Sequence, residues 1–143
     1  MKFTFSWLKD HLNTSANVNE IVDCLNKIGL EVSNLKTYKT DVKNLKVAKI
    51  IDVKKHPNAD KLNVCIIQFD EEQTQVICGA PNVKLNKKYV FAPSGTYIGG
   101  IDLTLKKAVI RDVESNGMLC SEKELEISDD HKGIIELPES INL

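Results

Sequence analysis

Apolar side chains recur at helical spacing in the first 28 residues. The positions three, four, seven and ten residues after Val18 are all apolar, which places one stripe on a single helix face: Val18, Ile21, Val22, Leu25 and Ile28. Asn17 with Glu20 three positions later forms a capping-box pattern, and Gly29 stands where a left-handed C-terminal residue is favoured. The pattern predicts a helix over residues 18–28.

Two shorter elements are expected on either side of this helix. Ser6 can cap a short helix over residues 7–12. After Gly29, the tripeptide Leu30-Glu31-Val32 has the composition of a short strand.

From about residue 40 the hydrophobic period changes to the alternation of β-strands. Proline, glycine and acidic turn residues separate the apolar runs, for example at Pro57 and at Gly99-Gly100. The strand candidates are residues 45–53, 62–69, 74–78, 89–92, 103–110, 117–120 and 133–137. Ser121 followed by Glu124 is a second capping box, which predicts a short helix over residues 122–125.

Five or so short strands with intervening loops fit an OB-type β-barrel, a fold whose groove commonly binds oligonucleotides. The expected fold class is α+β, mainly β with flanking helices. We expect an N-terminal helical segment at residues 1–39 and an OB-fold-like barrel at residues 40–143.

Composition agrees with a globular chain. Of the 143 residues, 42% are apolar and 27% are charged, and such a chain can bury a core without metals or disulfides. The longest apolar run falls far short of the roughly 20 residues of a membrane helix. Lys9 and Asp10 interrupt any signal-peptide core, so we expect a cytoplasmic protein. Four scattered cysteines without a C-x-x-C pair are expected to be reduced: Cys24, Cys65, Cys78 and Cys120.

The net charge of −1 conceals an asymmetry. Residues 36–111 carry 14 basic and seven acidic side chains, whereas residues 112–143 carry two basic and nine acidic ones. A basic middle suggests a polyanionic partner such as RNA. Solvated lysines that protect strand edges from aggregation explain the same excess equally well.

Catalytic and metal-binding patterns are missing. There is no phosphate-binding glycine loop, and the three histidines lack metal-ligand spacing. Asp129-Asp130-His131 fits a capped turn better than a metal site. Nothing near Cys78 would lower its thiol pKa, which argues against a nucleophile. We expect no catalytic residue, metal site or cofactor in this chain.

Three segments stand out from an ordinary barrel: HPNADKL from His56, CGAPN from Cys78, and GMLCS from Gly117. Pro57 fixes φ, and Asn58 can bond its own backbone, so the first segment is a rigid turn. Such a turn can present Lys61 and His56 to a phosphate, although a purely structural turn explains its proline and asparagine by itself.

In this order, HPNADKL, CGAPN and GMLCS-x-x-EL resemble the tRNA-binding domain family. That family includes appendices of some methionyl-tRNA synthetases and freestanding dimeric tRNA-binding proteins. FSWLK from Phe5, IGLEV from Ile28 and SDDHKGI from Ser128 further resemble the N-terminal part of bacterial phenylalanyl-tRNA synthetase β subunits. The resemblance covers roughly residues 3–139.

This resemblance implies a fragment of a longer subunit. The family's β subunit pairs with an α subunit in a heterotetramer that joins phenylalanine to its tRNA, using ATP and Mg²⁺. The active-site motifs belong to the α subunit, and the editing domain lies downstream, so no catalytic residue carries over. The helical opening is implied to be part of a domain completed after the barrel. We therefore expect the stripe on residues 18–28 to be partly uncovered.

The implied function is tRNA binding, with lysines and Arg111 on phosphates and His56, Tyr89 and Tyr97 stacked on bases. Lys54 and Lys55 would add phosphate contacts. The candidate residues are His56, Asn58, Lys61, Asn82, Lys84, Lys87, Lys88, Tyr89, Tyr97, Lys106, Lys107, Arg111 and Ser121. A docking module of the synthetase and a freestanding tRNA-binding dimer stay open as alternatives.

Two positions depart from the family pattern. Asp112, directly after Arg111, stands where the family usually has glycine, and so does Glu126. Both add negative charge near GMLCS, which weakens the case that this face contacts phosphate.

Overall fold

The computed structural model describes residues 1–37 and 39–143, which belong to two compact units. The first unit is Met1–Thr37, and the second contains the described residues from Lys39 to Leu143. That the first unit belongs to a domain completed elsewhere stays a prediction.

The longer helix of the first unit is α2 (Val18–Lys27). Its predicted capping box is confirmed: the Asn17 side chain accepts the N–H of Glu20 at 3.1 Å, and the Glu20 carboxylate accepts the N–H of Asn17 at 2.7 Å. Gly29 has φ of +87°, the left-handed conformation expected after the helix. The sequence therefore specifies both ends of this helix.

The predictions on either side of α2 need correction. Helix α1 (Phe5–His11) begins earlier than expected, because the Thr4 hydroxyl, not that of Ser6, accepts the N–H of Trp7 at 3.2 Å. Residues 30–32 do not form a strand. A strand there lacks a neighbour to pair with, because neither helix of this unit offers an edge.

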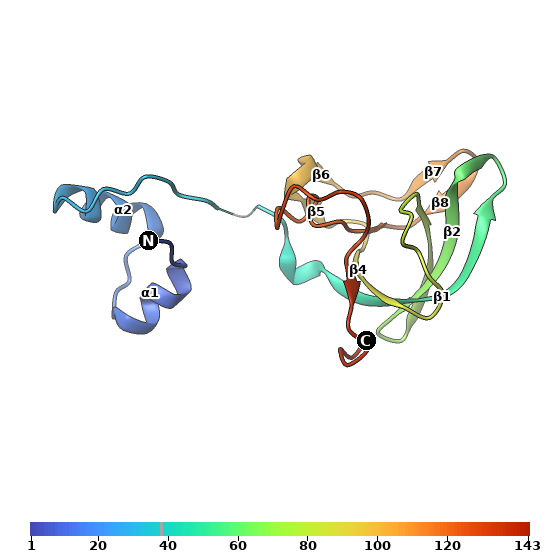
Figure 1. The fold of residues 1–143 in the computed structure, drawn as a ribbon, viewed down its shortest axis with the longest axis horizontal. Coiled ribbons are helices and arrows are strands. Elements are labelled where there is room, and N and C mark those ends of the chain that lie inside the picture. Colours follow the sequence, from blue (N-terminus) through green and yellow to red (C-terminus); the bar gives the residue numbers. More distant parts are fainter. Residues whose placement is uncertain (38) are drawn as a thin grey trace. The chain divides into compact units, whose positions relative to one another are not determined.

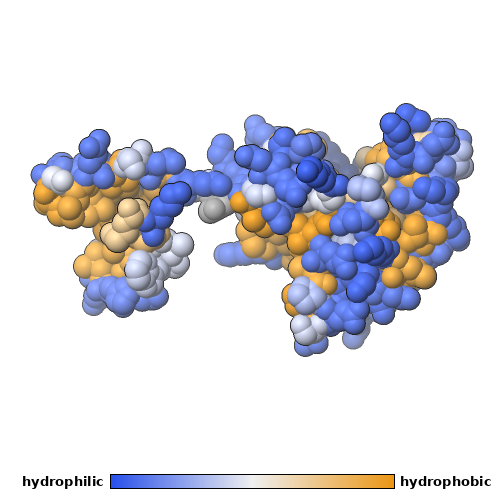
Figure 2. All heavy atoms as spheres, viewed as in Figure 1, coloured by the Kyte–Doolittle hydropathy of each residue, from blue (hydrophilic) through white to orange (hydrophobic). Residues whose placement is uncertain are grey.

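The apolar stripe of α2 is partly uncovered, as predicted. Neither helix contains a buried residue, and Ile28, just after α2, is 65% exposed. Trp7 and Leu30 are also exposed. Figure 2 shows hydrophobic side chains over much of the visible side of both helices.

The second unit is built on an antiparallel sheet that curls into a barrel (Figure 1). Its strand order is β10-β4-β1-β2-β3, and β9 pairs with β4 and also lies against β3, which closes the ring. This arrangement is an OB-like barrel, as predicted. The strands are β1 (Lys46–His56), β2 (Ala59–Phe69), β3 (Glu72–Cys78), β4 (Lys88–Ala92), β9 (Met118–Leu119) and β10 (Glu136–Leu137).

The connection between β4 and β9 carries two small hairpins. Strand β5 (Tyr97–Ile98) pairs with β6 (Leu103–Thr104), and β7 (Ala108–Ile110) pairs with β8 (Val113–Ser115). Two 3₁₀ turns complete the unit, η1 (Val42–Asn44) before β1 and η2 (Gly99–Ile101) between β5 and β6.

Alternation along the strands fills the barrel. Ala48 and Ile50 of β1 point inward, and so do Cys65 and Ile67 of β2, all with 0% exposure. Tyr89 and Phe91 of β4 complete the same cluster. A second cluster includes Ile98 of β5 and residues from neighbouring segments: Ala92, Ile98, Leu105, Cys120 and Leu125.

Three element predictions in this unit need correction. Residues 103–110 form two strands, because Leu105 turns inward and separates β6 from β7. Residues 122–125 form successive turns, because Glu126 has φ of +60° and ends any helical path. The capping-box bonds form nonetheless: the N–H of Ser121 donates to the Glu124 carboxylate at 2.6 Å. The final strand is shorter than predicted, Glu136–Leu137.

Candidate nucleic-acid interface

The turn between β1 and β2 is joined to the hairpin of β7 and β8. His56, only 4% exposed, holds the first link. Its Nδ1 accepts the N–H of Asn58 at 3.1 Å, so Nε2 carries the ring proton and donates it to the carbonyl of Ile110 at 3.0 Å. Burial between these partners corrects the expectation that His56 stacks on a base.

Asn58 and Arg111 form the second link, and it is reciprocal. The side-chain amide of Asn58 donates to the carbonyl of Arg111 at 3.1 Å, and the Arg111 guanidinium donates to the carbonyl of Asn58 at 3.0 Å. The same amide lies 3.3 Å from the Asp112 carboxylate. We call these four residues, His56, Asn58, Arg111 and Asp112, the clasp.

Lys61 is presented by an irregularity in β2. Lys55 pairs with Asn63, but His56 pairs with Ala59, so three residues of β2 have no partner on β1. Bulges of this kind re-aim side chains beside functional sites. A Cβ on Gly79 would lie 3.1 Å from Leu62, so the CGAPN segment packs against the same bulge.

Cationic side chains gather around this junction. Lys106 and Lys107 immediately precede β7, within roughly 15 Å of Ile110 along an extended chain. Lys55 and Lys61 flank the β1–β2 turn, and all four are exposed. Within residues 1–37 and 39–143, no carboxylate lies within ion-pair distance of them, whereas Lys54 pairs with Asp52 at 3.0 Å. We call Lys55, Lys61, Lys106 and Lys107 the junction lysines.

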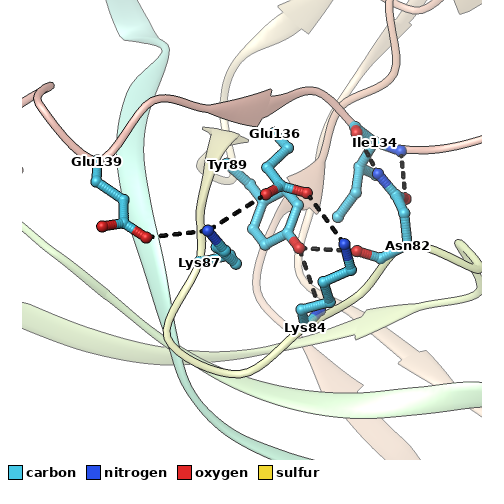
Figure 3. A network of polar contacts seen from close by, with 7 residues as sticks. All are labelled: Asn82, Lys84, Lys87, Tyr89, Ile134, Glu136 and Glu139. Atoms are coloured by element: carbon cyan, nitrogen blue, oxygen red, sulfur yellow. Dashed lines mark hydrogen bonds and ion pairs between the residues drawn. The ribbon is translucent and has the colours of Figure 1, made fainter.

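A second group of predicted lysines faces the acidic end of the chain instead (Figure 3). Lys87 pairs with Glu139 at 2.9 Å and with Glu136 at 3.7 Å, and Lys84 lies 3.8 Å from Glu136. Lys88 donates to the carbonyl of Glu139 at 3.0 Å. A phosphate at this place has to compete with two carboxylates already present.

The ion pair of Lys87 and Glu139 shifts the pKa of both groups. A hydrogen bond from Lys87 and its charge lower the pKa of Glu139, and the same contact with Glu139 raises the pKa of Lys87. Both shifts favour the charged forms. Because Glu139 is exposed and Lys87 is only half-buried, salt screens this pair, and it anchors β10 only weakly.

Asn82 and Tyr89 fasten the barrel rather than face solvent (Figure 3). The Asn82 amide donates to the carbonyl of Ile134 at 2.7 Å and accepts the N–H of Ile134 at 3.0 Å. Tyr89 is fully buried, and its hydroxyl donates to the Asn82 carbonyl at 2.7 Å. The expectation that Tyr89 stacks on a base needs correction for this reason.

The other two predicted polar residues are also engaged. The Tyr97 hydroxyl donates to Asp102 at 2.5 Å, and this bond, with desolvation, raises the pKa of Tyr97. Ser121 is buried at 6% exposure and bonds Glu124.

The polar motif residues His56, Asn58 and Asn82 therefore join segments of the barrel to one another, and Ser121 is buried in a local turn. Their side-chain chemistry could have distinguished them from the junction lysines in the sequence. Short amide and hydroxyl side chains beside turns tend to bond nearby backbone, whereas long lysine side chains extend into solvent.

The three buried thiols are poor nucleophiles. Burial raises the pKa of Cys65 and of Cys120 to about 12, and burial also raises the pKa of Cys78. These thiols stay protonated near neutral pH. Across the described parts of the chain, no three His, Cys, Asp or Glu side chains cluster as a metal would require, and no helix is long and apolar enough to span a bilayer.

The chain is similar to a known domain family, to subunits of a tRNA ligase and to one solved structure. A family profile described as "Putative tRNA binding domain" matches residues 45–143. The phenylalanine–tRNA ligase beta subunit of Ruegeria pomeroyi is 49% identical over 138 residues, which is 96% of this chain and 17% of that protein. The corresponding subunit of Bartonella quintana is 50% identical over 140 residues, 97% of this chain and again 17% of its own length.

A solved structure shares the fold. The MetRS-related protein from Pyrococcus horikoshii superposes with a TM-score of 0.50 at 22% identity, over 75% of this chain and 94% of that one. The chain thus spans less than a fifth of the length of these ligase subunits, and it covers nearly all of the smaller structural relative.

Proposed function

Because the chain belongs to the family described as putative tRNA binding domain and is about half identical to part of phenylalanine–tRNA ligase beta subunits, we propose that its barrel binds tRNA through the junction lysines. The observation that carries the proposal is the grouping of Lys55, Lys61, Lys106 and Lys107 around two joined loops, without carboxylate partners in the described chain. OB-folds bind oligonucleotides with the corresponding loops, those after the first and fourth barrel strands.

The wider activity belongs to the longer protein. We propose that this chain is part of a subunit that works with an α subunit to join phenylalanine to tRNA in the cytoplasm. ATP and Mg²⁺ would be used by the whole enzyme outside this chain, and this chain would supply tRNA contact and no catalytic group.

Phosphate contact fits the chemistry of the junction better than base reading does. The aromatic rings of Tyr89 and Phe91 are buried, and Tyr97 is tied to Asp102, so the described residues offer little stacking surface beside the junction lysines. Lysine recognises phosphate as a point charge without base selectivity. Binding of this kind is governed by counterion release.

A salt series with a tRNA transcript tests the proposal. The chain should bind with an affinity that falls as salt rises, and Lys61→Gln/Lys106→Gln/Lys107→Gln should lower the magnitude of the slope by about 2, at roughly 0.7 per lost contact. The matched control is Lys84→Gln/Lys87→Gln/Lys88→Gln, which removes the same charge. Affinity that ignores salt in the unaltered chain would overturn the proposal, and so would an equal loss in both triple variants.

A docking function is the second candidate, and one observation favours it. An apolar groove of about 610 Å³ lies along β1, β4 and β10, lined by side chains that include Val47, Val90 and Leu137. Val42 and Ile127 at its edge are 65% and 59% exposed. Unaltered tRNA affinity in the triple variant of the junction lysines would count against RNA contact at that place and would favour docking.

A further inference from the structure

The β7–β8 hairpin, which follows two of the junction lysines, is too small to hold its own shape. It has three residue pairs, Ala108 with Ser115, Val109 with Glu114 and Ile110 with Val113, and it forms a sheet separate from the barrel. An isolated two-stranded hairpin of this length is marginally stable at best in water. Its position therefore depends on bonds to neighbouring segments.

One strand of the hairpin is fixed to the barrel wall. The carbonyl of Glu114 accepts a bond from the Gln75 side chain at 2.7 Å, and the Ser115 hydroxyl accepts the N–H of Ile77 at 3.1 Å. Both contacts join β8 to β3. They leave β7, and the lysines just before it, without support from the same wall.

The segment that carries Lys106 and Lys107 is held at its two ends. Before it, Leu105 is buried and exchanges backbone bonds with Gly95 and Thr96. After it, the carbonyls of Ile110 and Arg111 accept the bonds from His56 and Asn58. The clasp is thus the second anchor of a lysine-bearing span.

The β1–β2 turn needs the clasp as well. Two-residue hairpin turns that match strand twist require positive φ, and neither Pro57 nor Asn58 has it. Arg111 supplies a bond to the Asn58 carbonyl, and His56 bonds the Asn58 N–H. Arg111 therefore supports the turn through one guanidinium nitrogen, and because its side chain is exposed, its contact with phosphate stays a prediction.

From these contacts we propose that Asn58 is a positioning residue for tRNA binding: it holds the junction lysines on both loops in one arrangement before RNA arrives. The inference rests on the proposed function. Fixing rotamer-rich lysines in advance lowers the ordering cost of binding. Asn58 itself contacts no phosphate, so its loss acts through Lys106 and Lys107.

A double-mutant cycle in the full 143-residue chain tests this role, with tRNA affinity as the readout. Asn58→Ala should weaken binding about three- to tenfold, the ordering cost of one or two side chains. In the Asn58→Ala background, Lys106→Gln/Lys107→Gln should lower tRNA affinity by a smaller factor than it does in the unaltered chain. The combined variant should therefore lose less affinity than the product of the two separate fold-changes. Asn58→Asp keeps the size but loses the amide donor, and it should weaken binding at least as much.

The matched control is Asn44→Ala. Asn44 donates its amide to Asp41 near the start of β1, a surface bond remote in sequence from both loops. It should leave tRNA affinity within about twofold of the unaltered chain, a small surface effect.

The outcomes separate the two proposals. If the unaltered chain shows no salt-dependent tRNA binding, the proposed function itself fails. If that binding is present and weakened by the lysine substitutions, but Asn58→Ala leaves it unchanged, the positioning role is overturned alone. Independent losses in the cycle, or a lower melting temperature with unchanged affinity, also overturn it, because a merely structural residue behaves in that way.

Discussion

The carboxylate of Glu126 accepts the backbone N–H of Thr40, 86 residues earlier in the chain, at 3.2 Å. The same oxygen accepts the N–H of Lys39 at 2.8 Å and lies 3.4 Å from the Thr40 hydroxyl. Thr40 is buried at 7% exposure. Glu126 thus joins the segment that leads into β1 to the segment that follows β9. Its negative charge, which is expected to weaken phosphate binding, also stabilises the fold.

Replacing Glu126 by the glycine usual in the family should destabilise this chain. Glycine tolerates the positive φ of residue 126, which stabilises the folded chain by about 1 kcal/mol. The N–H of Thr40, however, loses its acceptor, which costs about 1–3 kcal/mol of stability. We expect a net loss of up to about 2 kcal/mol in the free energy of unfolding, measured by urea titration. Glu126→Gln keeps an acceptor oxygen and should lose less, and a Glu126→Gly chain more stable than the original would contradict this account.

The other departure should respond in the opposite direction. Arg111 and Asp112 have φ of +48° and +70° in the two-residue turn between paired Ile110 and Val113, the type I′ pattern that favours glycine. Asp112→Gly should raise the free energy of unfolding by about 0.5–1 kcal/mol, which is measured as a higher midpoint of urea unfolding. Asp112→Ala should not, because its Cβ keeps the penalty. Equal gains from both variants would show that charge, and not backbone conformation, limits this turn.

Gly117 and Gly95 separate backbone strain from steric overlap. Both have positive φ, +112° and +97°, but a Cβ on Gly117 would lie 2.4 Å from the carbonyl oxygen of Ala92, whereas a Cβ on Gly95 would meet nothing within 4 Å. Gly95→Ala should cost about 1–3 kcal/mol from strain alone. Gly117→Ala should cost clearly more, since backbone must move. Thermal melts of the two variants compare them directly, and the reverse order would refute the close approach.

Carboxyl titration by NMR should detect the pair of Lys87 and Glu139. Because the pKa of Glu139 is lowered in the folded chain, the pair contributes its full stabilisation above the ordinary carboxyl pKa and loses it as pH falls through the lowered value. In Lys87→Gln the pKa of Glu139 should rise toward its ordinary value. Lys107→Gln is the control and should leave it unchanged, and a pKa that ignores Lys87 would show that the pair does not form in solution.

Local patterns were enough to predict the elements that carry their own signal. Asn17 and Glu20 lie three residues apart and determine where α2 begins, and alternation along β1 and β2 marks the inward side chains. The same reasoning failed at Ser121 and Glu124. Their capping bonds form, but Glu126, held by Thr40 from far along the chain, prevents the helix that such a box usually starts.

Contacts between distant segments explain the wrong assignments in the candidate site. Lys87 and Glu139 are 52 residues apart, and Asn58 and Arg111 are 53 apart, so no spacing rule reveals either contact. His56 and Asn82 belong to the unusual segments HPNADKL and CGAPN, and a motif does not say whether its residues have a structural or a functional role. Opposite charge in residues 36–111 and 112–143 is a hint of the ion pairs, but it fits a polyanionic partner or solvated lysines at strand edges equally well.

Amide chemical-shift mapping with a tRNA transcript tests the central claim most directly. If tRNA binds at the junction of the two loops, the shifts that change on titration should concentrate in residues 54–61 and 106–112. Residues 84–88 and 136–141 should change little, because their charges already pair with one another. Changes confined to residues 84–88 and 136–141, with both loops unaffected, would contradict the account.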